Sequence, residues 1–210
     1  MGFLRSRSAT SGRQRKDVEF KEDMNLLSDF FLRAKHWQIF ILVFGVCLIG
    51  QVVLVTGAHS SEELGRASLM RLGLAVALTM LGFVLWFWSV GKFLCSLVHP
   101  DLRPRLTFFR AAIIWPVVFA FAVPSFFMSP EPGLFAVMVA GQLFAMVCLI
   151  YDVHFVAKTL ALVVTGERKS LPDFGGTFVL LWLFPVGIWV IQPQINGLYK
   201  GRGRPASPAR

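Results

Sequence analysis

The sequence predicts an all-α integral membrane protein, and three features of its composition support this prediction. Of its 210 residues, 55% are hydrophobic. Only 16% are charged, whereas soluble domains carry roughly 25% because charge must cover their surface. The charges are also clustered, which leaves five long stretches without Asp, Glu, Lys, Arg or His: 37–58, 72–91, 111–129, 133–151 and 174–199. Each stretch reaches or approaches the roughly 20 residues with which a helix crosses a bilayer.

Four regions follow from these stretches. Residues 1–16 are basic and rich in Ser and Gly, which predicts a disordered tail because such a segment buries too little apolar surface to fold. Residues 17–36 predict an amphipathic helix that lies in the membrane interface or docks on the bundle or a partner. Its apolar stripe is formed by Phe20, Met24, Leu27 and Phe31. Residues 37–199 are predicted to form the membrane helical bundle, and residues 200–210 a second disordered basic tail.

Four transmembrane helices are predicted, over residues 37–57, 69–95, 108–128 and 133–151, and the last continues as a helix to residue 165. Basic residues near spans mark the cytoplasmic side of a membrane protein. With the N-terminus inside, the cytoplasmic regions flanking these spans carry fifteen Lys and Arg residues, and the two external loops carry two. The sequence therefore predicts a cytoplasmic N-terminus.

The last apolar stretch, residues 174–196, is either a fifth span or a re-entrant segment. A full crossing would place the four basic residues of the C-terminal tail outside the cell. Pro185 and Gly187 lie at its middle, where proline removes a backbone donor and glycine weakens helix propensity. The stretch is nevertheless long enough to cross as a helix. We favour the re-entrant alternative, which leaves the C-terminus in the cytoplasm.

The C-terminal quarter carries a family resemblance. The segment LLWLFPVGIWVIQPQIN follows a helix that reads YDVHFVAKTLALV. Together they resemble a group of small, uncharacterised bacterial multi-pass membrane proteins. The resemblance implies a location in the bacterial inner (cytoplasmic) membrane, and it carries over no activity and no site residues.

Polar residues near the end of the fourth span form one candidate site. Tyr151, His154 and Lys158 share a helix face, and Asp152 lies on a neighbouring face. A carboxylate, an imidazole and an amine can perform acid–base chemistry. We favour a belt at headgroup depth that contacts lipid or a partner, with Lys158 extending toward water. Asp152 and His154 are therefore not expected to be catalytic.

Amides form a second set of candidates. Gln192, Gln194 and Asn196 cluster where the last apolar stretch ends, which predicts a helix end that contacts headgroups, a cavity mouth or a partner. Gln51 and Gln142 lie inside predicted spans, where each is expected to hydrogen-bond across a helix contact.

The cysteines and the remaining motifs indicate no reaction. Cys47, Cys95 and Cys148 lie in apolar stretches without metal-ligand spacing, so we expect them to be reduced and buried. The chain has no nucleophile, metal or nucleotide motif. We therefore predict no catalytic, cofactor-binding or metal-binding residues and no cofactor.

The leading functional hypothesis is a non-enzymatic accessory or scaffold subunit of a bacterial membrane assembly. One alternative is a channel or transporter for a small or lipidic solute; the absence of ionisable residues from the apolar stretches argues against proton coupling. A membrane-embedded lipid-modifying enzyme is the other alternative. The expected partners are other membrane subunits and a bilayer with anionic lipids, which attract the basic tails. No base-stacking residues accompany those tails, so specific nucleic-acid binding is not predicted.

Overall fold

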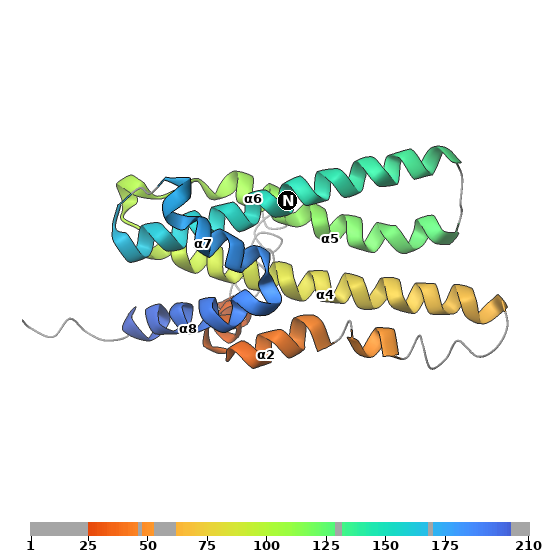
Figure 1. Cartoon of the computed structure of the whole chain (residues 1–210), viewed down its shortest axis with the longest axis horizontal. Helices are drawn as coiled ribbons and strands as arrows, with labels where there is room; N and C mark the ends of the chain where they lie inside the picture. The colour runs from red at the N-terminus through yellow and green to blue at the C-terminus, as the bar shows by residue number, and fades with distance from the viewer. Residues whose placement is uncertain (1–24, 46–47, 53–61, 129–131, 168–169, 203–210) are drawn as a thin grey trace, which may run out of the picture.

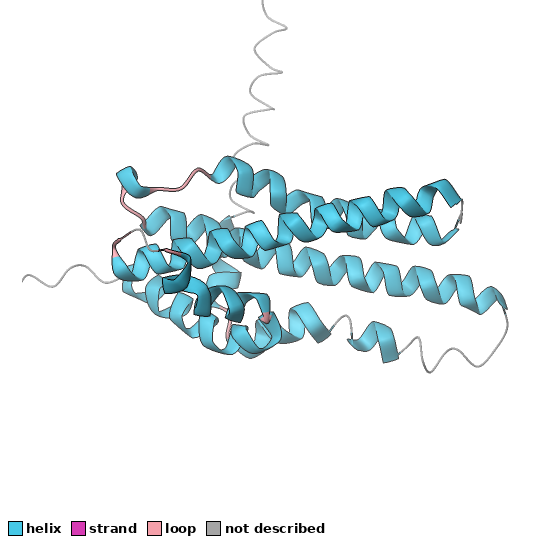
Figure 2. Ribbon diagram, turned by 45° about the horizontal axis from the view of Figure 1, so that its top comes forward, coloured by secondary structure: helices cyan, strands magenta, loops and turns pink. Residues whose placement is uncertain are grey.

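The computed structural model is a helical bundle, and in the described part of the chain every regular element is a helix (Figures 1 and 2). The described residues are 25–45, 48–52, 62–128, 132–167 and 170–202. After the helical segment Asn25–Arg33, the elements are α2 (His36–Phe40), the π-helix η1 (Ile41–Gly45), helical residues 48–52, α4 (Glu62–Leu97), the 3₁₀ helix η2 (Pro100–Leu102), α5 (Leu106–Met128), α6 (Pro132–Thr165), α7 (Leu171–Trp182) and α8 (Phe184–Arg202). The predicted tail of residues 1–16 lies outside the described residues.

Three long helices, α4, α5 and α6, form the frame of the bundle, and each packs on the next (Figure 1). Local signals set their ends. α6 begins at Pro132, a position where a missing backbone N–H costs no helix hydrogen bond. It ends at Gly166, whose φ of +73° is the left-handed conformation that commonly terminates helices. At 1.5 Å per residue, the 34 residues of α6 extend about 50 Å, well beyond a hydrocarbon core of about 30 Å.

Among the described residues, two helical stretches are long and apolar enough to cross a membrane, Gly73–Leu97 and Gly133–Thr165. The number rises to four if each of two bent helix pairs is counted as one span. α5 contributes a shorter apolar helical stretch, Leu106–Ala122. The all-helical architecture is therefore confirmed, and apolar helices suited to a membrane are present, but the predicted set of four spans is not confirmed.

α6 carries three of the candidate ionisable groups, and its helix continues to Thr165, as the sequence predicted. The sequence places the end of the fourth span at Tyr151; by length and composition the whole stretch to Thr165 is apolar enough to qualify, although it is longer than a hydrocarbon core requires. Asp152, His154 and Lys158 therefore lie in the same helix and the same candidate span. Their neighbours Val153, Phe155 and Val156 are apolar and buried, so this part of α6 also has a face that packs against the bundle.

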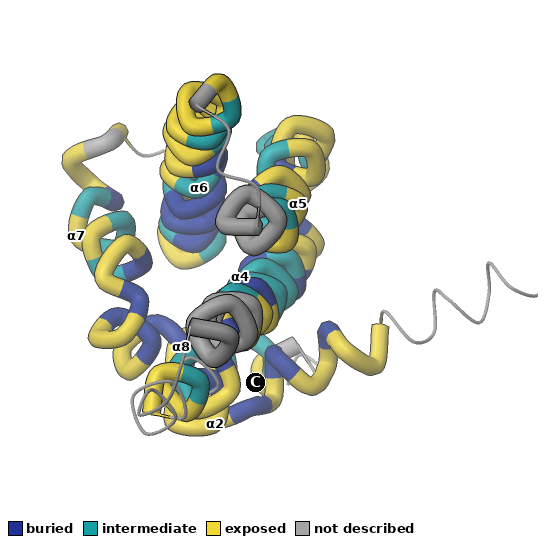
Figure 3. Tube along the Cα trace, turned by 90° about the vertical axis from the view of Figure 1, so that its right-hand side faces the viewer, coloured by how far each residue is buried: buried dark blue, intermediate teal, exposed yellow. Residues whose placement is uncertain are grey.

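The main hydrophobic core lies at the end of the bundle where α7, α8 and the N-terminal elements pack against the long helices (Figure 1). It includes Trp86 and Phe87 of α4, Val156 of α6, and Ile188 and Ile191 of α8. Figure 3 looks along the long axis and shows the buried positions of α6 and α7 on the sides that face the bundle. The two long apolar helices differ in burial. In α4, 39% of the most apolar 18-residue window is buried, and in α6 only 11% is buried.

The last apolar stretch is broken into α7 and α8, which meet at a bend of 117° (Figure 1). Leu183 ends α7 with a non-helical ψ of 53°. Its carbonyl then accepts hydrogen bonds from the N–H groups of Val186, at 2.9 Å, and Gly187, at 2.8 Å. Pro185 is the second residue of α8, where proline is tolerated. The start of α7 and the end of α8 consequently lie at the same end of the bundle.

The N-terminal helical segment docks on the bundle, which is one of the predicted alternatives. Phe31 and Leu32 are buried in the core, whereas Leu27 is 45% exposed. The predicted stripe is therefore wrong at Leu27, because the docked face is set by contact with α8 and α4 and not by apolar spacing alone. Phe20 and Met24, the other predicted stripe residues, lie outside the described residues.

The predictions for the cysteines and for the start of the C-terminal tail have different outcomes. Cys95 and Cys148 are free and buried, as expected, and Cys47 lies outside the described residues. The C-terminal tail does not start at residue 200, because α8 continues to Arg202; residues 203–210 lie outside the described residues.

Candidate functional site at the basic end of the bundle

Gln192 joins three elements through its side-chain amide. The side chain is fully buried. Its Oε1 accepts a hydrogen bond from the indole N–H of Trp86 on α4, at 2.9 Å. Its Nε2 donates to the carbonyls of Phe31, at 2.9 Å, and Ala34, at 3.0 Å. These carbonyls lie at the end of the first helical segment, where backbone acceptors lack partners within the helix.

Asn196 extends the same network one turn further along α8. Its Nδ2 donates to the Ala34 carbonyl at 3.2 Å, and its Oδ1 accepts from Gln192 Nε2 at 3.2 Å. Gln194, between them in sequence, is exposed. The predicted role of IQPQIN as a helix end is therefore wrong for Gln192: the helix continues past it, and its amide satisfies another segment's backbone inside the core.

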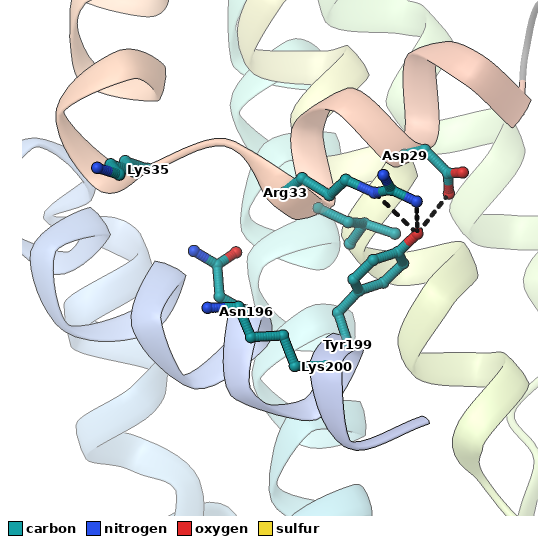
Figure 4. A pocket seen from close by; sticks show the side chains of 7 residues that line it. Asp29, Arg33, Lys35, Asn196, Tyr199 and Lys200 are labelled. Carbon is teal, nitrogen blue, oxygen red and sulfur yellow. Dashed lines mark hydrogen bonds between the residues drawn. The ribbon is translucent and has the colours of Figure 1, made fainter. Parts of the chain in front are cut away.

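A pocket of about 760 Å³ lies between the first helical segment and the end of α8 (Figure 4). Its lining residues are Asp29, Leu32, Arg33, Lys35, Asn196, Tyr199 and Lys200. Three of these side chains are cationic and one is anionic, so the pocket carries an excess of positive charge. Leu32 is buried and contributes an apolar wall.

Tyr199 organises one wall of this pocket. Its hydroxyl accepts hydrogen bonds from Nε and Nη2 of Arg33, each at 3.3 Å, and donates to Oδ1 of Asp29 at 3.1 Å. Figure 4 shows the side chains of Arg33 and Asp29 converging on the Tyr199 hydroxyl. The Arg33 guanidinium carbon also lies 5.6 Å from the centre of the Tyr199 ring. The Tyr199 hydroxyl thus holds Arg33 in place, and this hydrogen bond, with the nearby Asp29 carboxylate, raises the pKa of Arg33, which stays positively charged.

The four residues of the predicted belt on α6 do not share one face. Tyr151 and Lys158 are exposed and His154 is half-buried, so these three share an outward face. The His154 ring packs edge-on against Phe174 of α7, with ring centres 5.4 Å apart. Asp152 faces inward and is only 2% exposed, and its Oδ1 has no hydrogen-bond partner among the described residues. Asp152 therefore does not belong to a lipid-facing belt.

The two remaining candidate amides are both exposed. The amide of Gln142 makes no hydrogen bond within the described part of the chain, so the predicted contact with another helix is not seen among those residues. Gln51 is exposed near the end of residues 48–52. Within the described residues, no group of three or more His, Cys, Asp and Glu side chains could hold a metal ion.

Sequence reasoning missed most of the pocket. Arg33 and Lys35 were counted only as orienting charges, and Tyr199 only as the end of an apolar stretch. A signal was nevertheless present, because Gln192 and Asn196 of IQPQIN lie four residues apart on one helix face and need hydrogen-bond partners once the helix continues. The partner segment lies about 160 positions earlier in the chain, and no local pattern identifies it.

No family model matches the chain, and no curated protein or solved structure shows significant similarity to it.

Proposed function

We propose that the chain is a non-enzymatic accessory or scaffold subunit of a bacterial inner-membrane assembly. One observation carries this proposal: the amide of Gln142 is exposed on the least buried part of α6 and makes no hydrogen bond to any other residue that the structure describes. Counted from Pro132, Gln142 lies about 15 Å along the helix, which is the middle of a core of about 30 Å that starts there. An amide at that depth gains from a hydrogen bond to another helix.

The surface around Gln142 supports the same conclusion. Val139 and Met146 lie one turn before and one turn after it and are 43% and 42% exposed. Lipid covers such apolar side chains as well as protein does, but lipid tails offer nothing to an amide. A partner helix that supplies a hydrogen-bond donor or acceptor covers the apolar side chains and also satisfies the amide. The basic end of the bundle, where Arg33, Lys35 and Lys200 lie, remains free for cytoplasmic contacts.

Photo-crosslinking in native membranes tests the subunit role. A benzophenone amino acid at Val139 is expected to give a protein-sized adduct that Gln142→Leu strongly reduces. The matched control is the same probe at Ala145, which is buried and should give no such adduct. Adducts with lipid alone at Val139 would refute the proposal, and adducts only with a second copy of the chain would replace it with self-association.

The proposed topology places the N-terminus, the basic end and the C-terminus in the cytoplasm, with α7 and α8 forming a re-entrant hairpin. The 117° bend supports this arrangement, as does the fifteen-to-two distribution of basic residues. The exposed side chains at the apex, Trp182, Leu183 and Val186, would enter the apolar layer.

Single cysteines at Ser170 and Gly201, in a chain whose native cysteines are replaced, test the hairpin. Both positions are exposed, so a membrane-impermeant maleimide should label both from the cytoplasmic side of inverted vesicles and neither from the opposite side. Labelling from opposite sides would establish a fifth span and contradict the hairpin.

A second candidate function is a channel or transporter for a small or lipidic solute. Asp152 favours it, because buried carboxylates within spans commonly mark ion or solute pathways. Loss of solute flux in proteoliposomes on Asp152→Asn, with folding preserved, would favour transport; unchanged flux would remove this candidate.

A further inference from the structure

We infer that the pocket between the segment Asn25–Arg33 and the end of α8 binds a phosphate-bearing anion, and that the anion is the headgroup of an acidic phospholipid. This inference does not depend on the accessory-subunit role, because the pocket residues lie near the first helical segment and the end of α8, whereas Gln142 lies in α6.

The charges of the pocket fit an anion. Arg33, Lys35 and Lys200 contribute three positive charges against the single carboxylate of Asp29. Within the described residues neither lysine takes part in an ion pair. Asp29 accepts a hydrogen bond from the Tyr199 hydroxyl, so it is held at one edge of the pocket. Ammonium and guanidinium groups are the usual ligands of phosphate oxygens in proteins.

Hydrogen bonds also hold the pocket residues in place before a ligand binds. Gln192 and Asn196 fix the carbonyl of Ala34, which precedes Lys35 directly. The Tyr199 hydroxyl fixes Arg33. The cations therefore come from two elements that the amide network holds at a set separation, and binding need not order either element. A volume of about 760 Å³ lies within the range of pockets that hold small molecules.

The surroundings indicate a lipid in preference to a free phosphate. The segment that supplies Arg33 also exposes Leu26, at 69%, and Phe30, at 53%, and Trp37 in the following helix α2 is 45% exposed. Exposed apolar side chains next to a basic pocket suit the boundary between headgroups and acyl chains. A soluble phosphate ester would make no use of them.

Binding of fluorescent phosphatidylglycerol to the detergent-solubilised full chain tests the inference, with phosphatidylcholine as the neutral comparison. The double variant Lys35→Gln/Lys200→Gln is expected to bind phosphatidylglycerol about tenfold more weakly, because each basic group near an anionic headgroup contributes appreciably. Both side chains are exposed, so the variant should keep the thermal unfolding midpoint of the parent chain.

The matched control is Arg103→Gln/Arg105→Gln, which removes two exposed charges from the turn before α5, outside the pocket. It should change affinity by no more than about twofold. If both double variants weakened phosphatidylglycerol binding equally, or if phosphatidylcholine bound equally well, the pocket would not be the anion site. Glycerol phosphate serves as the soluble competitor. Failure to displace the lipid supports the headgroup assignment, whereas displacement at equal concentration would overturn that assignment in favour of a soluble phosphate.

Discussion

Replacing Gln192 with leucine is expected to lower the free energy of unfolding by about 3 kcal/mol, because buried polar groups left without a partner cost about 1–3 kcal/mol each. The indole N–H of Trp86 and the carbonyl of Phe31 both lose the bond that Gln192 makes. Ala34 keeps its bond to Asn196. The measurement is unfolding of the detergent-solubilised chain in increasing dodecyl sulfate, followed by tryptophan fluorescence and circular dichroism.

Gln194→Leu provides the matched control, since it makes the same change two residues along α8 at an exposed position. It should alter stability by less than about 0.5 kcal/mol. A double-mutant cycle with Trp86→Phe then isolates the bond between Trp86 and Gln192, and we expect the two losses to be less than additive. Equal effects of the Gln192 and Gln194 substitutions would show that the amide network does not stabilise the bundle.

Gly187→Ala is expected to open the bend between α7 and α8. A Cβ atom at position 187 would overlap the backbone carbonyl of Leu180. That carbonyl is main chain, so no side-chain rotation can relieve the overlap and the two helices must move apart. Overpacking of this kind costs about 3 kcal/mol. Spin labels at Ser170 and Gly201 would report the opening as a longer inter-label distance, and unfolding in dodecyl sulfate would give the loss of stability.

Gly197→Ala is the control for this change, because Gly197 is also in α8 and a Cβ atom added there would meet no other atom within 4 Å. It should be neutral or stabilising by up to about 1 kcal/mol, as alanine is the better helix former. If Gly187→Ala left the inter-label distance unchanged, the close approach of the two helices would not determine the bend.

The two substitutions concern the same functional element. Gln192 holds the first helical segment against α8, and Gly187 permits the bend that brings α8 back to the basic end. Together they bring Arg33, Lys35 and Lys200 to the lining of one pocket. Loss of either should therefore weaken lipid binding indirectly, with a fall in thermal stability that the Lys35→Gln/Lys200→Gln variant lacks. That difference separates damage to the pocket's support from removal of its charges.

The sequence by itself determined the helical class, the apolar stretches and the uneven distribution of charge. These are local properties, because a run without charges can satisfy its backbone in an apolar environment only as a helix or a closed barrel. Pro185 and Gly187 marked the place where the last stretch breaks, for the equally local reason that proline lacks a donor and glycine lacks a Cβ atom. The burial of Cys95 and Cys148 followed from the same apolar patterning.

Only the tertiary structure decided which polar groups meet. Gln192 bonds to carbonyls about 160 positions away, and such a pairing depends on how α8 folds back and not on any spacing in the sequence. Asp152 and Tyr151 are neighbours in the chain, yet one is buried and the other exposed, because adjacent helical residues point in different directions and the packing partner selects the inward one. The pocket follows the same principle: its charged residues are present in the sequence, but they line one pocket only because α8 folds back at Leu183 and the amides of Gln192 and Asn196 bind the end of the first helical segment.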